Sequence, residues 1–196
     1  GGVEQRIIKL ETELYNSITH QKSSLTLDSF TQELKEIKQL IIDQHQSLYV
    51  SQINSLLNKV HLFGFHFANL DIRQDSRKHA QFFNTLVTAL IESGSTIFPE
   101  NYFDLKQDQQ IQVLSKVQGK VDLSLIKDEE TLKALHTMKA IKTIQSTNGQ
   151  AAANRYIISN NQSTLHVMQL FAMLKIVAFD DALTVDIGPL FETITD

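Results

Sequence analysis

The feature that most constrains the fold of this chain is a change in hydrophobic period near residue 64. Before it, apolar residues recur every three or four positions, which is the spacing of amphipathic helices. The helices that this spacing predicts span 3–18, 27–44 and 48–62. From Phe65 to Arg73 apolar and polar residues alternate, which predicts a strand because successive strand side chains point to opposite faces. We therefore expect a helical region over 1–63 and a differently built region over 64–196.

The second region alternates strand-like and helix-like segments. Two further strands are predicted over 155–159 and 184–192. The predicted helices span 76–93, 106–117, 128–144 and 163–177. This order implies parallel strands joined by right-handed crossovers, and three strands are too few to close a barrel of eight. The expected fold is mainly α with a few parallel β-strands. It is a slice of an α/β (TIM-like) barrel with flanking helices, about three βα elements and a helical insertion around 95–150.

Composition excludes several classes of function. With 20% charged residues, a net charge of −4 and no basic stripe, the chain lacks the footprint of a nucleic-acid-binding protein. It has no cysteine, which excludes disulfides, thiolate metal sites and cysteine nucleophiles. No run approaches the ~18 apolar residues of a membrane span. We expect no nucleic-acid or membrane partner and a cytoplasmic location. The Gly-Gly start and the PLFETITD end suggest a piece of a longer protein.

Polar residues gather at the end of the first predicted strand, where Asp71 and Arg73 share a face. In an α/β barrel the carboxyl ends of the strands open on the active site. An arginine there presents a planar fork of donors that suits phosphate or carboxylate, and a neighbouring acid can orient it. The alternative is that Arg73 only caps the strand and pairs with Asp71 or Asp75. His79 lies one turn into the next helix. It either supports this site indirectly, without touching a ligand, or is solvated.

Glu192 ends the third predicted strand in the same manner. A carboxylate at a barrel mouth suits Mg²⁺ or Mn²⁺, because these ions take oxygen ligands. The alternative is an acid in the first turn of a following helix, where the helix dipole favours negative charge. The seven histidines form no HxxxH or HExxH pattern, so zinc is not expected. No glycine-rich phosphate loop occurs either.

Three segments carry a resemblance to a known family. FGFHFANLDIRQDSRKH resembles the LD-[IL]-RQ segment of phosphoenolpyruvate carboxylase. NRYIISNNQSTLHVMQLFAML resembles the strand and helix that the family carries next, and IGPLFETITD resembles its PLFET strand. The segments stand in the family's order with similar separations, over about residues 57–196. On these motifs the chain is identified as a member of that family.

The resemblance implies a mostly helical enzyme around an α/β barrel. Such an enzyme adds bicarbonate to phosphoenolpyruvate and yields oxaloacetate and phosphate, an anaplerotic carbon fixation. The resemblance also implies Mg²⁺ or Mn²⁺ as cofactor and a homotetrameric parent. Arg73 matches the arginine of the RQ motif, which helps to hold phosphate, and Glu192 matches the PLFE glutamate, which binds the metal. Asp71 and His79 stand as possible supporting residues.

Several motifs that the resemblance calls for are absent from this chain. They are the GHPT histidine upstream, and the GYSDS acid and the GRGGS arginine loop downstream. We therefore expect the chain alone to be catalytically inactive. The competing hypothesis is a non-catalytic helical interaction module that retains the motifs as relics.

Overall fold

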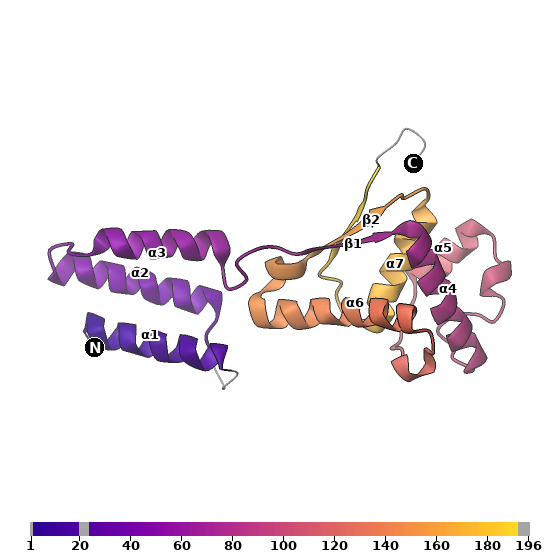
Figure 1. Ribbon diagram of the computed structural model, residues 1–196, viewed down its shortest axis with the longest axis horizontal. Helices are drawn as coiled ribbons and strands as arrows, with labels where there is room; N and C mark the ends of the chain where they lie inside the picture. The colour runs from indigo at the N-terminus through magenta and orange to yellow at the C-terminus, as the bar shows by residue number, and fades with distance from the viewer. Residues whose placement is uncertain (1, 20–23, 192–196) are drawn as a thin grey trace. The chain divides into compact units, whose positions relative to one another are not determined.

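A computed structural model describes residues 2–19 and 24–191 of the chain (Figure 1). The chain divides into two compact units, residues 1–68 and 69–196. Among the described residues, no helix combines the length and the apolar content that a bilayer crossing requires.

The first unit consists of three helices, α1 (Val3–Ile18), α2 (Leu27–Gln44) and α3 (Val50–Phe63). Helix α2 packs against both α1 and α3 (Figure 1). It begins at a capping box, in which the Thr26 hydroxyl accepts a hydrogen bond from the Ser29 amide at 3.1 Å. The buried core of this unit is Leu10, Phe30, Leu34, Ile37, Ile41, Ile53 and Val60. The predicted helices are confirmed, the third with a start two residues later than expected.

The segment between α3 and the first strand is not extended, so the prediction of a strand from Phe65 is wrong. Gly64 and Phe67 have φ angles of +52° and +61°, in the left-handed region that breaks a strand. The Phe67 amide donates to the Phe63 carbonyl at 2.8 Å, and the two rings stack at 5.2 Å. Phe65 instead packs on the helical core, with its ring 5.7 Å from that of Phe30. Tertiary packing of these aromatic side chains overrode their alternation in the sequence.

The second unit contains a parallel sheet with strand order β1-β2-β3. The strands are β1 (Asp71–Asp75), β2 (Arg155–Ser159) and β3 (Asp186–Pro189). The predicted parallel pairing is confirmed, and β2 has the predicted bounds. Pro189 of β3 pairs with Ile158 of β2. Strand β3 lies at an edge of the described sheet, where a missing backbone N–H is tolerated.

Four α-helices and three short 3₁₀-helices complete the second unit. The α-helices are α4 (Ser76–Glu92), α5 (Gln107–Ser115), α6 (Glu129–Asn148) and α7 (Thr164–Val177). The 3₁₀-helices are η1 (Tyr102–Asp104), η2 (Leu123–Leu125) and η3 (Gln150–Ala153). The irregular stretch after α4 is anchored by aromatic packing, with the Phe98 and Tyr102 rings 5.8 and 5.7 Å from that of Phe83. The molecule is thus mainly helical with a few parallel strands.

One face of the sheet carries the core. Ile72, Tyr156, Ile158 and Ile187 share this face by register and pack in the large cluster formed with α4, α6 and α7. Tyr156 and Ile158 are buried. The residues between them in sequence alternate onto the other face, and none of them belongs to the core cluster. The sheet therefore has a helix-covered face and a second face on which Asp71, Arg73 and Arg155 lie beside the half-buried Ile157, and which we call the polar face.

Gln145 of α6 holds the approaches to β2 and β3 in place. Its Nε2 donates to the carbonyls of Ala153 at 2.7 Å and Thr184 at 3.0 Å. Its Oε1 accepts from the Thr184 hydroxyl at 2.6 Å. A single amide side chain thus satisfies backbone groups just before two neighbouring strands, which fixes their starting points against α6.

Candidate functional site

The polar face of the sheet centres on Asp71, the first residue of β1. Its carboxylate lies 3.7 Å from Nη2 of Arg73 and 3.0 Å from Nε of Arg155, the residue opposite it on β2. The predicted neighbours Asp71 and Arg73 are therefore together, and β2 adds a second arginine. The prediction that they end the strand is wrong: Asp71 begins β1 and Arg73 is its middle residue, because the strand starts six residues later than its sequence pattern indicated. The side chain of Arg73 is 69% exposed, so most of its donors face solvent. A guanidinium in this state can bind an anion with little loss of existing bonds.

A second acid–arginine pair lies where β1 passes into α4. Asp75 is the N-cap of α4 and accepts from the Arg77 amide at 2.8 Å. Its carboxylate also accepts from Nε and Nη2 of Arg77 at 2.9 and 2.8 Å. The side-chain bond from Arg77 is the main cause that lowers the pKa of Asp75 to about 2. Because Asp75 is taken by Arg77, the acid beside Arg73 is Asp71.

His79 is fully buried, and the alternative of a solvated histidine is wrong. Its Nε2 lies 3.1 Å from the hydroxyl of Tyr156, on the helix-covered face. Burial lowers the pKa of His79 to about 4, Asp75 opposes this shift, and His166 adds to it. The ring is therefore neutral at pH 7. His79 lies behind β1 and β2, on the face opposite Arg73.

The turns that follow β1 and β2 are joined by a residue that the sequence reasoning missed. The hydroxyl of Ser76, at the start of α4, donates to the carbonyl of Asn160, just after β2. Asn160 has a φ angle of +51°, a conformation that asparagine tolerates better than most residues. The bond ties together the carboxyl ends of two strands. The only sequence signal is a serine beside an N-cap, since its partner is 84 residues away.

The described residues do not form a metal site. No three histidine, aspartate or glutamate side chains in residues 2–19 and 24–191 gather closely enough to hold an ion. Asp71 and Asp75 are both engaged by arginines. The predicted metal ligand, Glu192, lies outside the described residues. The chain leaves β3 beside the end of β2, where the Leu190 amide donates to the Ile158 carbonyl at 2.8 Å.

Comparisons with known proteins point to the same family over nearly the whole chain. Residues 4–196 match the family model described as phosphoenolpyruvate carboxylase. A phosphoenolpyruvate carboxylase of Synechococcus sp. is 28% identical over 176 residues, which cover 86% of this chain and 16% of that protein. One from Prochlorococcus marinus is 29% identical over 186 residues, which cover 90% and 18%. The chain spans less than a fifth of the length of these two relatives. The chain belongs to the phosphoenolpyruvate carboxylase family.

Proposed function

We propose that this chain is a segment of a phosphoenolpyruvate carboxylase, a lyase that forms oxaloacetate and phosphate from phosphoenolpyruvate and bicarbonate. The family match over residues 4–196 and the names of the relatives support this proposal. The proposal includes these substrates, a cytoplasmic location and a homotetrameric parent protein. It also includes the division of the chain into a helical region, 1–63, and a barrel region, 64–196.

We also propose that the sheet is a slice of an α/β barrel. Two observations support this: all described strands are parallel, and the core helices pack on one face of the sheet. In a barrel the helices form an outer ring and the other face points inward. An open sheet wound on both sides would have helices on both faces. The polar face would then line the barrel interior, with Asp71 at the amino end of β1 and Arg73 halfway along the strand toward the mouth.

The observation that carries the proposed role of Arg73 is its exposed guanidinium, which touches only the Asp71 carboxylate among the ion pairs of the described residues. We assign Arg73 to the phosphate group of phosphoenolpyruvate and Asp71 to its orientation. Transfer of the phosphoryl group to bicarbonate breaks the bond to the enol oxygen and leaves an enolate and carboxyphosphate. Negative charge builds up on the phosphoryl oxygens, and a fixed guanidinium stabilises it there.

Glu192 is proposed as a ligand of Mg²⁺ or Mn²⁺, with the remaining ligands supplied by parts of the longer protein. The divalent cation would stabilise negative charge on the enolate. His79 is proposed as a supporting residue that acts through β2, because it contacts Tyr156 and lies on the opposite face from Arg73. We expect the chain alone to be inactive, since it carries one arginine and one metal carboxylate of a larger set.

The test is oxaloacetate formation by the full-length protein that contains this segment, with phosphoenolpyruvate, bicarbonate and Mg²⁺. Arg73→Ala is expected to lower kcat/KM about 100-fold or more, the loss typical of removing a donor to transition-state charge. Arg73→Lys should recover only part of the rate, because a lysine keeps the charge and loses the planar fork. Arg6→Ala, which changes an arginine of α1, is the control and should leave the rate unchanged.

Three results would decide against parts of the proposal. A folded full-length protein without carboxylase activity would favour the non-catalytic interaction module. Equal activity of the Arg73→Ala protein and the unchanged protein would remove the phosphate role. Bicarbonate-dependent phosphate release by the 196-residue chain alone would contradict the expected inactivity of the segment.

A further inference from the structure

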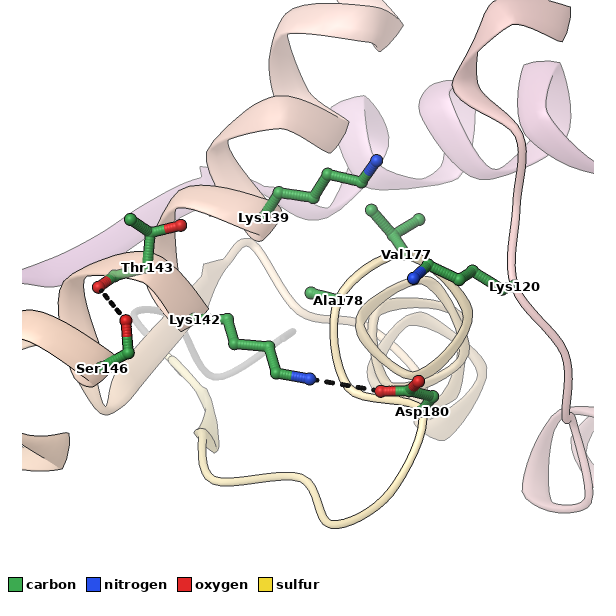
Figure 2. Close-up of a pocket in the computed structure, with 8 residues that line it drawn as sticks. All are labelled: Lys120, Lys139, Lys142, Thr143, Ser146, Val177, Ala178 and Asp180. Atoms are coloured by element: carbon green, nitrogen blue, oxygen red, sulfur yellow. Dashed lines mark hydrogen bonds and ion pairs between the residues drawn. The ribbon is translucent and has the colours of Figure 1, made fainter.

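A groove of about 420 Å³ lies between α6, the segment before η2 and the end of α7 (Figure 2). Its lining residues are Lys120, Lys139, Lys142, Thr143, Ser146, Val177, Ala178 and Asp180. Helix α7 starts after the carboxyl end of β2 and returns to the amino end of β3, so its last residue, Val177, marks the amino ends of the strands. The groove is therefore at the other end of the sheet from the turns that follow β1 and β2.

The backbone around the groove holds three lysines in place. Lys139 and Lys142 are three residues apart on α6 and so are neighbours on the helix surface. Lys120 sits on a segment that is docked on α7, because the next residue, Val121, is buried and its amide donates to the Ile176 carbonyl at 3.0 Å. Figure 2 shows Lys139 and Lys142 projecting from α6, with Lys142 reaching Asp180, and Lys120 entering from a different part of the chain.

The acidic groups nearby do not neutralise all three lysines. Asp180 is the one acid in the lining, and its bond to Nζ of Lys142 at 3.2 Å is the main cause that lowers its pKa. Among the described residues, neither Lys120 nor Lys139 has a carboxylate within the 4.0 Å of an ion pair. Asp180 acts on Lys120, and Asp122 on Lys139, only through longer-range attraction.

The end of α7 does not account for the unpaired lysines. Helix carbonyls at a C-terminus attract cations. The last turn of α7 already carries a cation, Lys175, whose Nζ donates to the carbonyls of Asp180 and Asp181 in the turn beyond the helix. Lys120 and Lys139 are left as two ammonium groups that line one groove without a described carboxylate in ion-pair distance. An anion bound in the groove would be attracted by both.

We propose that this lysine groove, formed by Lys120, Lys139 and Lys142, binds a phosphate-bearing anion. An ammonium group binds phosphate as a point charge with three donors, so two of them can share the oxygens of one dianion. The hydroxyl of Thr143 on the same helix adds a donor beside them. The groove is within the range of volumes that small-molecule sites have, about 300 Å³ upward.

The test is a titration of the ¹⁵N-labelled 196-residue chain with inorganic phosphate at constant ionic strength, followed by amide NMR shifts. We expect saturable shifts at residues 117–121, 139–146 and 177–181, with a Kd on the order of 1 mM. The double variant Lys120→Gln/Lys139→Gln should weaken binding at least about tenfold, since it removes both unpaired charges.

A control variant tests whether the binding belongs to this groove. Lys9→Gln/Lys59→Gln makes the same change in net charge within the first unit and should leave the affinity unchanged. Shifts near Arg73, which the proposed function assigns to phosphate, are followed separately from those of the groove, so this inference can fail while the proposed function stands, and the reverse. The proposal is overturned if the shifts of the groove residues do not saturate or if the lysine double variant binds there normally.

Discussion

The two units of the chain differ sharply in how much of their apolar surface they bury. Among the residues that the structure describes, the first buries seven core side chains, whereas the second buries twenty-six in one cluster. Large apolar side chains are exposed mainly in the first unit: Ile7, Ile8, Tyr15, Ile18, Ile42, Leu48, Tyr49, Leu56, Leu62, Phe63 and Phe67. Those of the second unit are Leu70, Phe103, Leu125 and Phe191.

The difference separates helix formation from core formation. Helix α1 forms with the bounds that its periodicity predicts, yet Leu10 is its one buried residue and Ile18 is 76% exposed. In the second unit α7 buries seven residues in fourteen, because the sheet and three helices surround it. Local pattern was sufficient to place both helices. Only the second unit supplies enough neighbours for burial to contribute most of the stability.

The largest expected effect compares one leucine from each core. Leu174→Ala should destabilise the second unit by about 3 kcal/mol, because it empties a fully buried site in a dense cluster. Leu10→Ala should destabilise the first unit less, by about 2 kcal/mol, because the sparse core around this leucine can relax into the space. Urea-dependent hydrogen exchange, read separately for peptides of each unit, measures both. An equal or larger loss for Leu10→Ala would break the comparison.

An intermediate effect should appear as a pH dependence confined to the second unit. Burial lowers the pKa of His79 from 6.5 to about 4. Between these pH values the unfolded chain binds a proton at His79 that the folded chain does not. The contribution of neutral His79 to stability is complete above pH 6.5 and is lost as pH falls from 6.5 toward 4. His79→Gln should flatten that part of the curve.

The measurement is the free energy of unfolding of the second unit between pH 4 and pH 7, from exchange of peptides in α4 and β2. His61→Gln, a change at an exposed histidine of α3, is the matched control and should leave the slope unchanged. A slope that persists in the His79→Gln protein would assign the titration to other groups, such as His166, whose pKa burial also lowers, or carboxylates.

The smallest effect is expected for the ion pairs of the first unit. Arg6 of α1 lies 2.8 Å from both Glu33 and Glu36 of α2, at a partly exposed position where water and salt still screen the charges. Arg6→Ala should lower the stability of the first unit only slightly, and high salt should erase the difference. Thermal melts at low and high ionic strength measure this. A large, salt-independent loss would mean that the arginine stem, and not its charge, holds α1 on α2.

Much of the candidate site followed from residues that are close in sequence. Asp71 and Arg73 are two positions apart on one strand, so alternation placed them on the same face. Arg155 was not foreseen, because it reaches Asp71 only through the parallel register of β1 and β2. The false start of the first strand has the opposite cause. Its alternating aromatic residues satisfied the strand pattern, and packing on α2 and α3 used them otherwise.

The sequence by itself determined the helices, the parallel pairing of the strands, the family and the placing of Arg73 on the same strand face as Asp71. These depend on periodicity and on short motifs, which act over a few residues. Tertiary structure alone decided that His79 is buried against Tyr156 and that Ser76 joins two strand ends. It also decided that three lysines line one groove beside α7. Their partners are distant in sequence, with separations of 77 and 84 residues for the first two, and no local pattern specifies which groups the fold brings together.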